Sequence, residues 1–306
     1  MIETALLIAC ALLLDRVLGE VPRMHPLVGF GKFAAWIEQR LNKSADAGMT
    51  QRIFGVLAWI ITITPWVAII FLLWQQGALR PFVSVLVLYF ALGMQSLDEH
   101  ARRIQQALQA NDLALARQHV GDIVSRDTSA MQPEDVARAG VESVLENGND
   151  AVFAALFWFA VAGAPGVLLY RLANTLDAMW GYRTPRFLFF GWAAARLDDI
   201  LNFLPARLTA ITYALLGRTR LALRCWQQQA HTWDSPNAGP VMASGAGSLN
   251  VKLGGAANYH GSMEQRPALG TELAPQAADI ARAMALVKRG AWLWAALLLL
   301  TGLLYA

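Results

Sequence analysis

The stretch IFGVLAWIITITPWVAIIFLLW, residues 53–74, runs without a single charged side chain. A helix needs about 20 consecutive, mostly apolar residues to cross the hydrocarbon core of a bilayer, so this stretch predicts a membrane-spanning helix. Pro65 lies in its middle and removes one backbone hydrogen bond, which predicts a kink at that point. The apolar stretches on either side then decide how often the chain crosses.

Three further stretches predict spans. Residues 81–97 follow the first one closely, residues 291–305 are short but almost purely apolar, and residues 2–14 continue as a helix to about residue 18. Each of them can reach across most or all of a bilayer core.

Two other apolar stretches are interrupted. Residues 151–172 contain Gly163-Ala164-Pro165-Gly166, and both Gly and Pro weaken a helix, so each half is too short to cross. A re-entrant or broken hairpin covered by other helices fits better, because irregular backbone at membrane depth must be buried in protein. Residues 200–217 carry Asn202, Pro205 and Arg207, and we expect them to be partly buried or interfacial.

The composition supports a membrane protein. Hydrophobic residues make up 56% of the 306 residues and charged residues only 15%, whereas a soluble domain usually carries about 25% charged residues. The alternative is a very apolar soluble enzyme with buried helices. We therefore predict an all-α, polytopic integral membrane protein, residues 1–306 in a single domain, with about four to five transmembrane helices, a re-entrant or broken hairpin and cytoplasmic helical segments.

Loop charges predict the orientation. Residues 19–52 and residues 98–150 each hold five Lys or Arg, whereas the connection at 75–80 holds one. Basic loops stay in the cytoplasm, so we expect the N-terminus outside and the polar segments 98–150 and 172–290 at the cytoplasmic face of a bacterial inner membrane. The net charge of +3 comes from scattered residues without a run of five like charges, which argues against nucleic acid as a partner.

Residues 98–150 carry ten Asp and Glu against five Arg. One basic and three acidic residues recur there at every fourth position, on one predicted helix face: Arg138, Glu142, Glu146 and Asp150. Either water screens this stripe, or Mg²⁺, which prefers oxygen ligands, relieves the repulsion. The stripe leads directly into the apolar hairpin, where exposed carboxylates are costly, and this favours the metal hypothesis.

Two later segments repeat the polar pattern. Asn174 and Asp177 are three residues apart and share a predicted helix face, and Arg196 precedes the pair Asp198-Asp199. Acids beside an arginine at a membrane boundary form either a structural ion-pair network or a second set of metal or phosphate ligands.

The third polar region is rich in glycine. Gly245, Gly247, Gly254 and Gly255 surround Lys252, and they could let backbone N–H groups approach an anion or simply allow small residues to pack closely between helices. Walker A, Rossmann, Ser-His-Asp and zinc-ligand patterns are all missing from the sequence, and Cys10 and Cys225 form neither a metal nor a disulfide pattern.

In their order along the chain, the motifs resemble those of one family. They are Asp15-Arg16 with His25-Pro26-Leu27-Val28-Gly29, Arg126-Asp127-Thr128-Ser129, Val141-Glu142-Ser143 with Glu146-Asn147, Asn174-Thr175-Leu176-Asp177, Arg196-Leu197-Asp198-Asp199 with Asn202 and Arg207, Ser235-Pro236-Asn237-Ala238-Gly239, Leu253-Gly254-Gly255 and Tyr259-His260-Gly261. This ordered set spans about residues 10–270. It is similar to the adenosylcobinamide-phosphate synthase (CobD/CbiB) family of cobalamin biosynthesis.

The resemblance implies a ligase. It would join adenosylcobyric acid, a corrinoid, to an aminoalcohol phosphate, either (R)-1-amino-2-propanol phosphate or ethanolamine phosphate, by an amide bond with Mg²⁺ present and ATP consumed. It implies a lipid bilayer and other late enzymes of the cobalamin pathway as partners.

On the resemblance we assign roles to the matching residues. Those expected to be catalytic are Asp127, Glu142, Glu146, Asp150 and Asp177. Those expected to bind substrate or phosphate are Arg126, Asn147, Asn174, Arg196, Arg207, Asn237 and Lys252. Those expected to hold the metal are Glu146, Asp150, Asp198 and Asp199.

Two other functions compete with the ligase. A multi-pass transporter would place its site on broken helices near the bilayer midplane, as the break at Gly163 allows. Against a transporter, the clearest predicted spans carry no charges and the acids cluster outside them. A non-catalytic membrane regulator would keep the scaffold and lose the acidic set, which is intact here.

Overall fold

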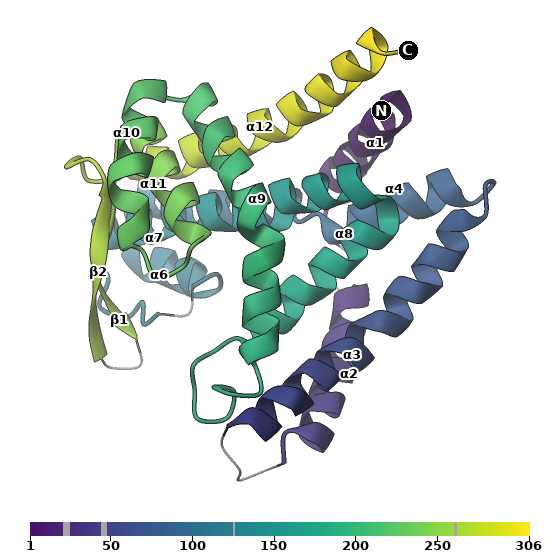
Figure 1. Cartoon of the computed structure of the whole chain (residues 1–306). Coiled ribbons are helices and arrows are strands. Elements are labelled where there is room, and N and C mark those ends of the chain that lie inside the picture. Colours follow the sequence, from purple (N-terminus) through teal and green to yellow (C-terminus); the bar gives the residue numbers. More distant parts are fainter. Residues whose placement is uncertain (21–24, 44–47, 125, 260–261) are drawn as a thin grey trace. The chain divides into compact units, whose positions relative to one another are not determined.

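A computed structural model of the whole chain describes residues 1–20, 25–43, 48–124, 126–259 and 262–306. His260 and Gly261, named among the motifs above, lie outside these residues, and so does Arg23, one of the five basic residues counted in residues 19–52. The helices in chain order are α1 (Ile2–Leu18), α2 (Pro26–Leu41), α3 (Met49–Gln75), α4 (Arg80–Ala91), α5 (Met94–Gln109), α6 (Leu113–Gly121), α7 (Pro133–Gly148), the π-helix η1 (Asn149–Phe153), α8 (Ala154–Trp180), α9 (Trp192–Leu216), α10 (Thr219–Gln229), the 3₁₀ helix η2 (Ala230–Thr232), α11 (Ala238–Leu249) and α12 (Ala277–Leu304). The strands β1 (Lys252–Tyr259) and β2 (Ser262–Gly270) follow α11 (Figure 1).

Four helical stretches are long and apolar enough to cross a membrane: 49–75, 80–109, 133–180 and 277–304. The prediction of an all-α, polytopic membrane protein is confirmed. The most apolar window of α3 is only 17% buried inside the protein, and large side chains such as Ile60 and Leu72 are exposed along it. An exposed apolar surface of this kind is suited to the hydrocarbon core of a bilayer, so α3 presents its side chains to lipid.

The predicted spans were nearly right in position. Residues 53–74 lie within α3, and residues 291–305 fall at the end of α12, which begins much earlier. Residues 81–97 divide between α4 and α5, because the chain leaves helical geometry at Leu92. The N-terminal stretch forms α1, a helix of 17 residues that is not among the four candidate spans, and neither is α9, which contains residues 200–216.

The predicted break in residues 151–172 is confirmed at one residue. Gly163 has φ 64° and ψ −155° within α8, a conformation that is essentially restricted to glycine. A Cβ atom at this position would lie 2.7 Å from Cζ2 of Trp74 on α3, so glycine also allows the two helices to approach. Whether the segment is re-entrant stays a prediction.

The chain divides into two compact units, and the prediction of a single domain stays a prediction. The first unit comprises residues 1–93, 154–202 and 298–306. Its core lies between α2, α3, α8 and the loop that precedes α9, where large side chains such as Phe30, Ile63, Trp180 and Phe190 are buried. The rings of Trp180 and Phe190 meet edge to face, with centroids 5.3 Å apart.

The second unit comprises residues 94–153 and 203–297. Its centre is α11, every residue of which is buried. Ser244 and Ser248 donate hydrogen bonds to backbone carbonyls of α9 at 2.6 and 2.7 Å, so the hydroxyl groups are satisfied in the core. The antiparallel hairpin β1–β2 lies alongside α10 and α11 (Figure 1). The all-α reading did not include this hairpin.

Replacing Gly163 tests the break in α8. We expect Gly163→Ala to lower the free energy of unfolding by about 1 to 3 kcal/mol, because alanine is strained in this conformation and its Cβ meets Trp74. Gly29→Ala is the matched control, since Gly29 lies within α2 with nothing within 4 Å of the added atom. Thermal unfolding of both variants in detergent gives the comparison. Equal stability of the two would show that the break is not needed.

Candidate functional site

Glu142 on α7 lies at the centre of a polar cluster in the second unit. Its Oε2 accepts a hydrogen bond from Nη2 of Arg126 at 2.5 Å, and Arg266 donates to both carboxylate oxygens at 3.3 Å. Oε1 also accepts the backbone N–H of Gly254 at 2.7 Å. These bonds use about the four acceptor sites that a carboxylate offers.

The cluster is buried. The side chains of Glu142 and Arg126 are 5% and 7% exposed, and that of Arg266 is 16% exposed. Glu142 therefore holds α7, the segment before it and the hairpin together. Its predicted catalytic role is not tested by this arrangement, but its oxygens are already occupied. Arg126, predicted to bind phosphate, is engaged by the same carboxylate.

Gly254 explains how the hairpin reaches Glu142. The register of the two strands shifts between Gly254 and Gly255 at a β-bulge, because Pro267 on β2 is an extra residue without a partner on β1, and the two glycines have φ of 75° and 78°. A Cβ atom at Gly254 would lie 2.0 Å from the carbonyl oxygen of Pro267, so only glycine can direct its N–H toward the carboxylate here. A glycine N–H was predicted to approach an anion, and in the structure that anion is the carboxylate of Glu142.

Glu146 is the acid of this cluster whose oxygens remain available. It lies one turn after Glu142 on α7, within electrostatic range of Glu142, Arg266 and Arg126. Its side chain is exposed and makes no hydrogen bond or ion pair in the described ranges. The neighbouring Asn147 donates to the backbone carbonyl and hydroxyl of Ser143, at 2.9 and 3.0 Å.

The predicted stripe of four residues is only partly present. Arg138 pairs with Glu134 and Asp135 on its own helix rather than with Glu142. After Gly148 the chain forms the π-helix η1, which widens the turn and changes the direction of Asp150 relative to a regular stripe. Asp150 instead accepts a hydrogen bond from Asn149 at 2.9 Å.

Three other predicted residues have structural partners. Arg207 donates to Oδ1 of Asn237 at 2.7 Å and to the carbonyl of Pro236 at 3.0 Å, which fastens α9 to the start of α11. Lys252 forms a surface ion pair with Glu272 at 2.7 Å.

Asp127 is exposed. It accepts the backbone N–H of Ser129 at 2.9 Å, and this bond, together with the Ser129 side chain, holds the pKa of Asp127 below its usual value. This loop contact gives Asp127 a local structural role, and its predicted catalytic role stays a prediction.

A second polar cluster lies in the first unit, where α8 and α9 meet. Asp198 accepts hydrogen bonds from Asn174 at 3.2 Å and Asn202 at 3.1 Å, and Tyr170 donates to Asn202 at 3.2 Å. Asp177 lies within electrostatic range of Asp198 and Asp199. The structure therefore brings together the Asn174–Asp177 and Asp198–Asp199 motifs, which the sequence placed on separate segments.

Burial governs the acids of α9. It raises the pKa of Asp198 to about 6, against the hydrogen bonds from Asn174 and Asn202, which favour the charged form, and Asp199 adds to the increase. Burial also raises the pKa of Asp199, while Arg196 and Arg183 oppose this rise. Groups held in such an environment are common where a protein binds a cation or moves a proton.

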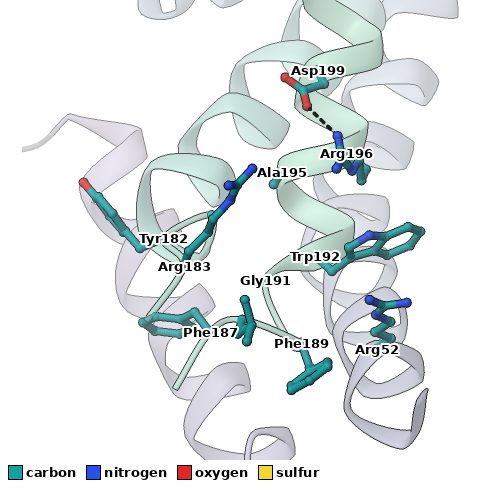
Figure 2. Close-up of a pocket in the computed structure, with 12 residues that line it drawn as sticks. Arg52, Tyr182, Arg183, Phe187, Phe189, Gly191, Trp192, Ala195, Arg196 and Asp199 are labelled. Carbon is teal, nitrogen blue, oxygen red and sulfur yellow. Dashed lines mark hydrogen bonds and ion pairs between the residues drawn. The ribbon is translucent and has the colours of Figure 1, made fainter. Parts of the chain in front are cut away.

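A pocket of about 450 Å³ adjoins Asp199 in the first unit. Its walls come from the loop 181–191, the start of α9 and Arg52 of α3 (Figure 2). Arg196, predicted to bind phosphate, lines it and pairs with Asp199 at 3.3 Å. We name it the arginine pocket, after its lining residues Arg52, Arg183 and Arg196.

The acids of the first unit supply at most part of a Mg²⁺ site by themselves. Within the described ranges no three His, Cys, Asp or Glu side chains form a group that could hold a metal ion. The predicted metal ligands are also divided, with Glu146 and Asp150 in the second unit and Asp198 and Asp199 in the first. Mg²⁺ commonly uses one or two carboxylates and completes its shell with water and substrate phosphates, so the partly buried pair Asp198-Asp199 has the chemistry of a partial site.

The sequence motifs do not identify three arginines of these sites: Arg52, Arg183 and Arg266. Arg266 could not be identified because its contact with Glu142 spans 124 positions and depends on the hairpin. Arg52 was counted only as a loop charge. A signal was available for Arg183, which follows Gly181-Tyr182 immediately after the α8 motif.

Glu142→Gln tests the buried cluster. We expect it to lower the free energy of unfolding by about 3 kcal/mol, since two buried guanidinium groups lose their counter-charge. Glu134→Gln is the control on the same helix, because its ion pair with Arg138 is exposed and worth less than about 1 kcal/mol. Chemical unfolding in detergent measures both. A Glu142 variant as stable as the Glu134 variant would contradict this account.

Comparison with known proteins gives the family. The model of the family described as CobD/Cbib protein matches residues 8–287. A relative from Stutzerimonas stutzeri, named cobalamin biosynthesis protein CobD, is 59% identical over 296 residues, covering 97% of each chain. Proteins of the same name from Chromobacterium violaceum and Mycobacterium tuberculosis are 55% and 39% identical, covering 99% and 92% of this chain and 98% and 89% of their own. No solved structure matches the chain. With nearly its whole length matched by the family and by these relatives, the chain belongs to the CobD/CbiB family.

Proposed function

We propose that this protein is a membrane-bound ligase of cobalamin biosynthesis, which joins adenosylcobyric acid to an aminoalcohol phosphate with ATP and Mg²⁺. The observation that carries the proposal is the set of partly buried acids Asp177, Asp198 and Asp199 beside an arginine-lined pocket, in a chain of the CobD/CbiB family. The names of the relatives support the pathway, and the chemistry of the site supports the reaction class.

The reaction needs an activated carboxylate, because a carboxylate and an amine do not condense favourably in water. In the proposed sequence the corrinoid carboxylate attacks the γ-phosphorus of ATP, the bond to ADP breaks, and an acyl phosphate forms. The amine of the aminoalcohol phosphate then attacks the acyl carbon, inorganic phosphate leaves, and a base takes up the amine proton. Such phosphoryl transfer depends on positioning and on charge stabilisation more than on a protein nucleophile.

The residues of each unit suit parts of this chemistry. In the first unit, Asp198 and Asp199 would share Mg²⁺ with phosphate oxygens, and Arg196 would stabilise negative charge. Asp177 is the acid that could accept the amine proton there. In the second unit, Glu146 offers an available carboxylate next to Arg126 and Arg266. Arg207, Asn237 and Lys252 are engaged elsewhere, so we give them no part in substrate binding.

A transporter is the second candidate, and the break of α8 at Gly163 favours it. Transport sites often lie on discontinuous helices, where freed backbone groups bind the substrate. The residues at the break are Gly, Ala and Pro, and α8 approaches Trp74 there rather than a polar group. This surrounding offers little to a charged or amide-rich solute, so the ligase remains the better supported function.

Reconstitution tests the ligase directly. We expect purified protein in detergent to convert adenosylcobyric acid, aminopropanol phosphate, ATP and Mg²⁺ into adenosylcobinamide phosphate, which mass spectrometry identifies. Asp177→Asn and Glu146→Gln should each reduce the rate at least about a hundredfold, because the charge that holds cation or proton is lost. Glu272→Gln, at a 90% exposed side chain, is the control and should retain full activity. Corrinoid flux into liposomes without any adduct would favour the transporter.

The cytoplasmic orientation is a separate proposal. In a background without Cys10 and Cys225, we expect Glu272→Cys to react with a membrane-impermeant maleimide only in inside-out vesicles. Glu3→Cys, near the N-terminus, should react only from the outer face of the membrane. Both residues are exposed, so differences in labelling report the side of the membrane. The reverse pattern would show that the proposed active site faces outward.

A further inference from the structure

The arginine pocket has more positive charge than its own acid can neutralise. Arg196 pairs with Asp199 at 3.3 Å, whereas Arg52 and Arg183 make no ion pair with a carboxylate in the part of the chain that the structure describes. Figure 2 shows Arg183 on the loop side and Arg196 with Asp199 on the α9 side. Among the residues that line the pocket there are three guanidinium groups and one carboxylate, and a lining with more positive than negative charge suits a ligand with several negative charges.

Arg52 is held in place by aromatic rings. Its guanidinium carbon lies 5.3 Å from the ring centroid of Trp192 and 5.8 Å from that of Phe189. Within the described residues its Nε atom is buried without a hydrogen-bond acceptor. Arg52 also lines the pocket, and its guanidinium group, which pairs with no carboxylate in the described residues, suits an anionic oxygen.

The pocket also presents aromatic surface. Phe187 and Phe189 contribute to its lining, together with Tyr182, which is 55% exposed, and Trp192, which is 40% exposed. An accessible indole face next to a guanidinium group is the kind of surface on which a nucleic-acid base stacks, and such stacking is worth about 1–3 kcal/mol. The pocket therefore combines a polyanion site with a platform for a planar ring.

The loop 181–191, which carries these aromatic residues, is anchored by contacts at Arg186 and Phe190. Arg186 donates to both oxygens of Glu38 on α2, at 3.0 and 2.6 Å, and the Glu38 side chain is only 5% exposed. Phe190, on the same loop, is buried against Trp180. Anchors on both sides of Phe187 and Phe189 keep the pocket formed without a ligand, which reduces the entropy lost on binding.

These features select one of the three substrates. An aminoalcohol phosphate carries a single phosphate and an ammonium group, which three arginines repel, and it has no ring to stack. A corrinoid is too large for a pocket of about 450 Å³ and carries no polyanion. A nucleoside triphosphate has both the charge and the planar base, and the volume lies within the range of small-molecule sites.

We propose that the arginine pocket binds ATP, with the triphosphate on Arg52, Arg183 and Arg196 and the adenine stacked on Trp192. This inference rests on the proposed function only for the identity of the nucleotide. Asp199, which pairs with Arg196 at the edge of the pocket, would then face the triphosphate and its Mg²⁺. The pocket thereby gives the nucleotide a site that belongs wholly to the first unit.

Direct binding of a non-hydrolysable analogue tests the pocket without corrinoid or turnover. Radiolabelled AMP-PNP with Mg²⁺ is equilibrated with the full chain in detergent. We expect Arg183→Gln to raise the dissociation constant about tenfold and the double variant Arg183→Gln/Arg196→Gln about a hundredfold, with weaker binding at high salt. Both side chains are exposed, so these changes should leave folding intact.

Two further variants separate stacking from general damage. Trp192→Ala should weaken binding about tenfold, and Trp192→Phe should restore most of it, because phenylalanine keeps an aromatic face. The matched control is Arg40→Gln, which removes a guanidinium group lying 4.2 Å over the Trp36 ring elsewhere in the first unit. Its dissociation constant should stay within about twofold of the unmodified protein.

Several outcomes would overturn the inference. One is AMP-PNP binding within twofold of normal in the double arginine variant, and another is no binding by the unmodified protein. A third is displacement of AMP-PNP by inorganic phosphate as readily as by ATP, which would indicate a simple phosphate site. An unchanged KM for ATP in a product-forming double variant would reject the pocket and leave the ligase standing. Pocket-dependent binding without any product would reject the ligase and support the pocket.

Discussion

Every charge that this chain carries away from water must find its partner inside the protein, because hydrocarbon solvates neither carboxylates nor guanidinium groups. Glu142 shows the consequence most clearly, since one buried carboxylate holds two arginines and a backbone N–H. Asp98 in the second unit is another example, since it forms an ion pair with Lys288 at 2.6 Å. In the first unit, the buried Glu38 side chain forms an ion pair with Arg186. In these examples the buried charged residues connect segments of the chain within each unit.

This constraint also marks the groups that do not serve the fold. In the part of the chain that the structure describes, Glu146 in the second unit makes no hydrogen bond or ion pair, and Arg52 and Arg183 of the arginine pocket make no ion pair with a carboxylate. A charge kept near a membrane surface without an internal partner lowers stability, so its presence calls for a ligand. Both the proposed reaction and the proposed nucleotide site rest on this separation of structural from available charges.

The two polar clusters are held in place by different means. In the second unit, Glu142 pairs with the guanidinium groups of Arg126 and Arg266, and the β-bulge of the hairpin directs the N–H of Gly254 to the same carboxylate. In the first unit, hydrogen bonds from two asparagines orient Asp198, while burial keeps its charged form costly and thus ready to accept a cation or proton. Rigid helices carry all the acids involved, and such support is what precise positioning of phosphoryl groups requires.

Hydropathy alone was enough to predict the membrane fold, because a long uncharged stretch such as residues 53–74 has few stable alternatives to a membrane-spanning helix. The sequence also located the break at Gly163, the acids of α7 to α9 and, through ordered motifs, the family. It could not determine which charges were free. Arg138 forms an ion pair with Glu134, and Arg207 donates a hydrogen bond to Asn237. Glu142 pairs with Arg266, which lies on a hairpin that was not predicted from the sequence. These pairings follow from the packing of the chain, because hydropathy is a property of a local segment whereas an ion pair between distant segments depends on which of them meet.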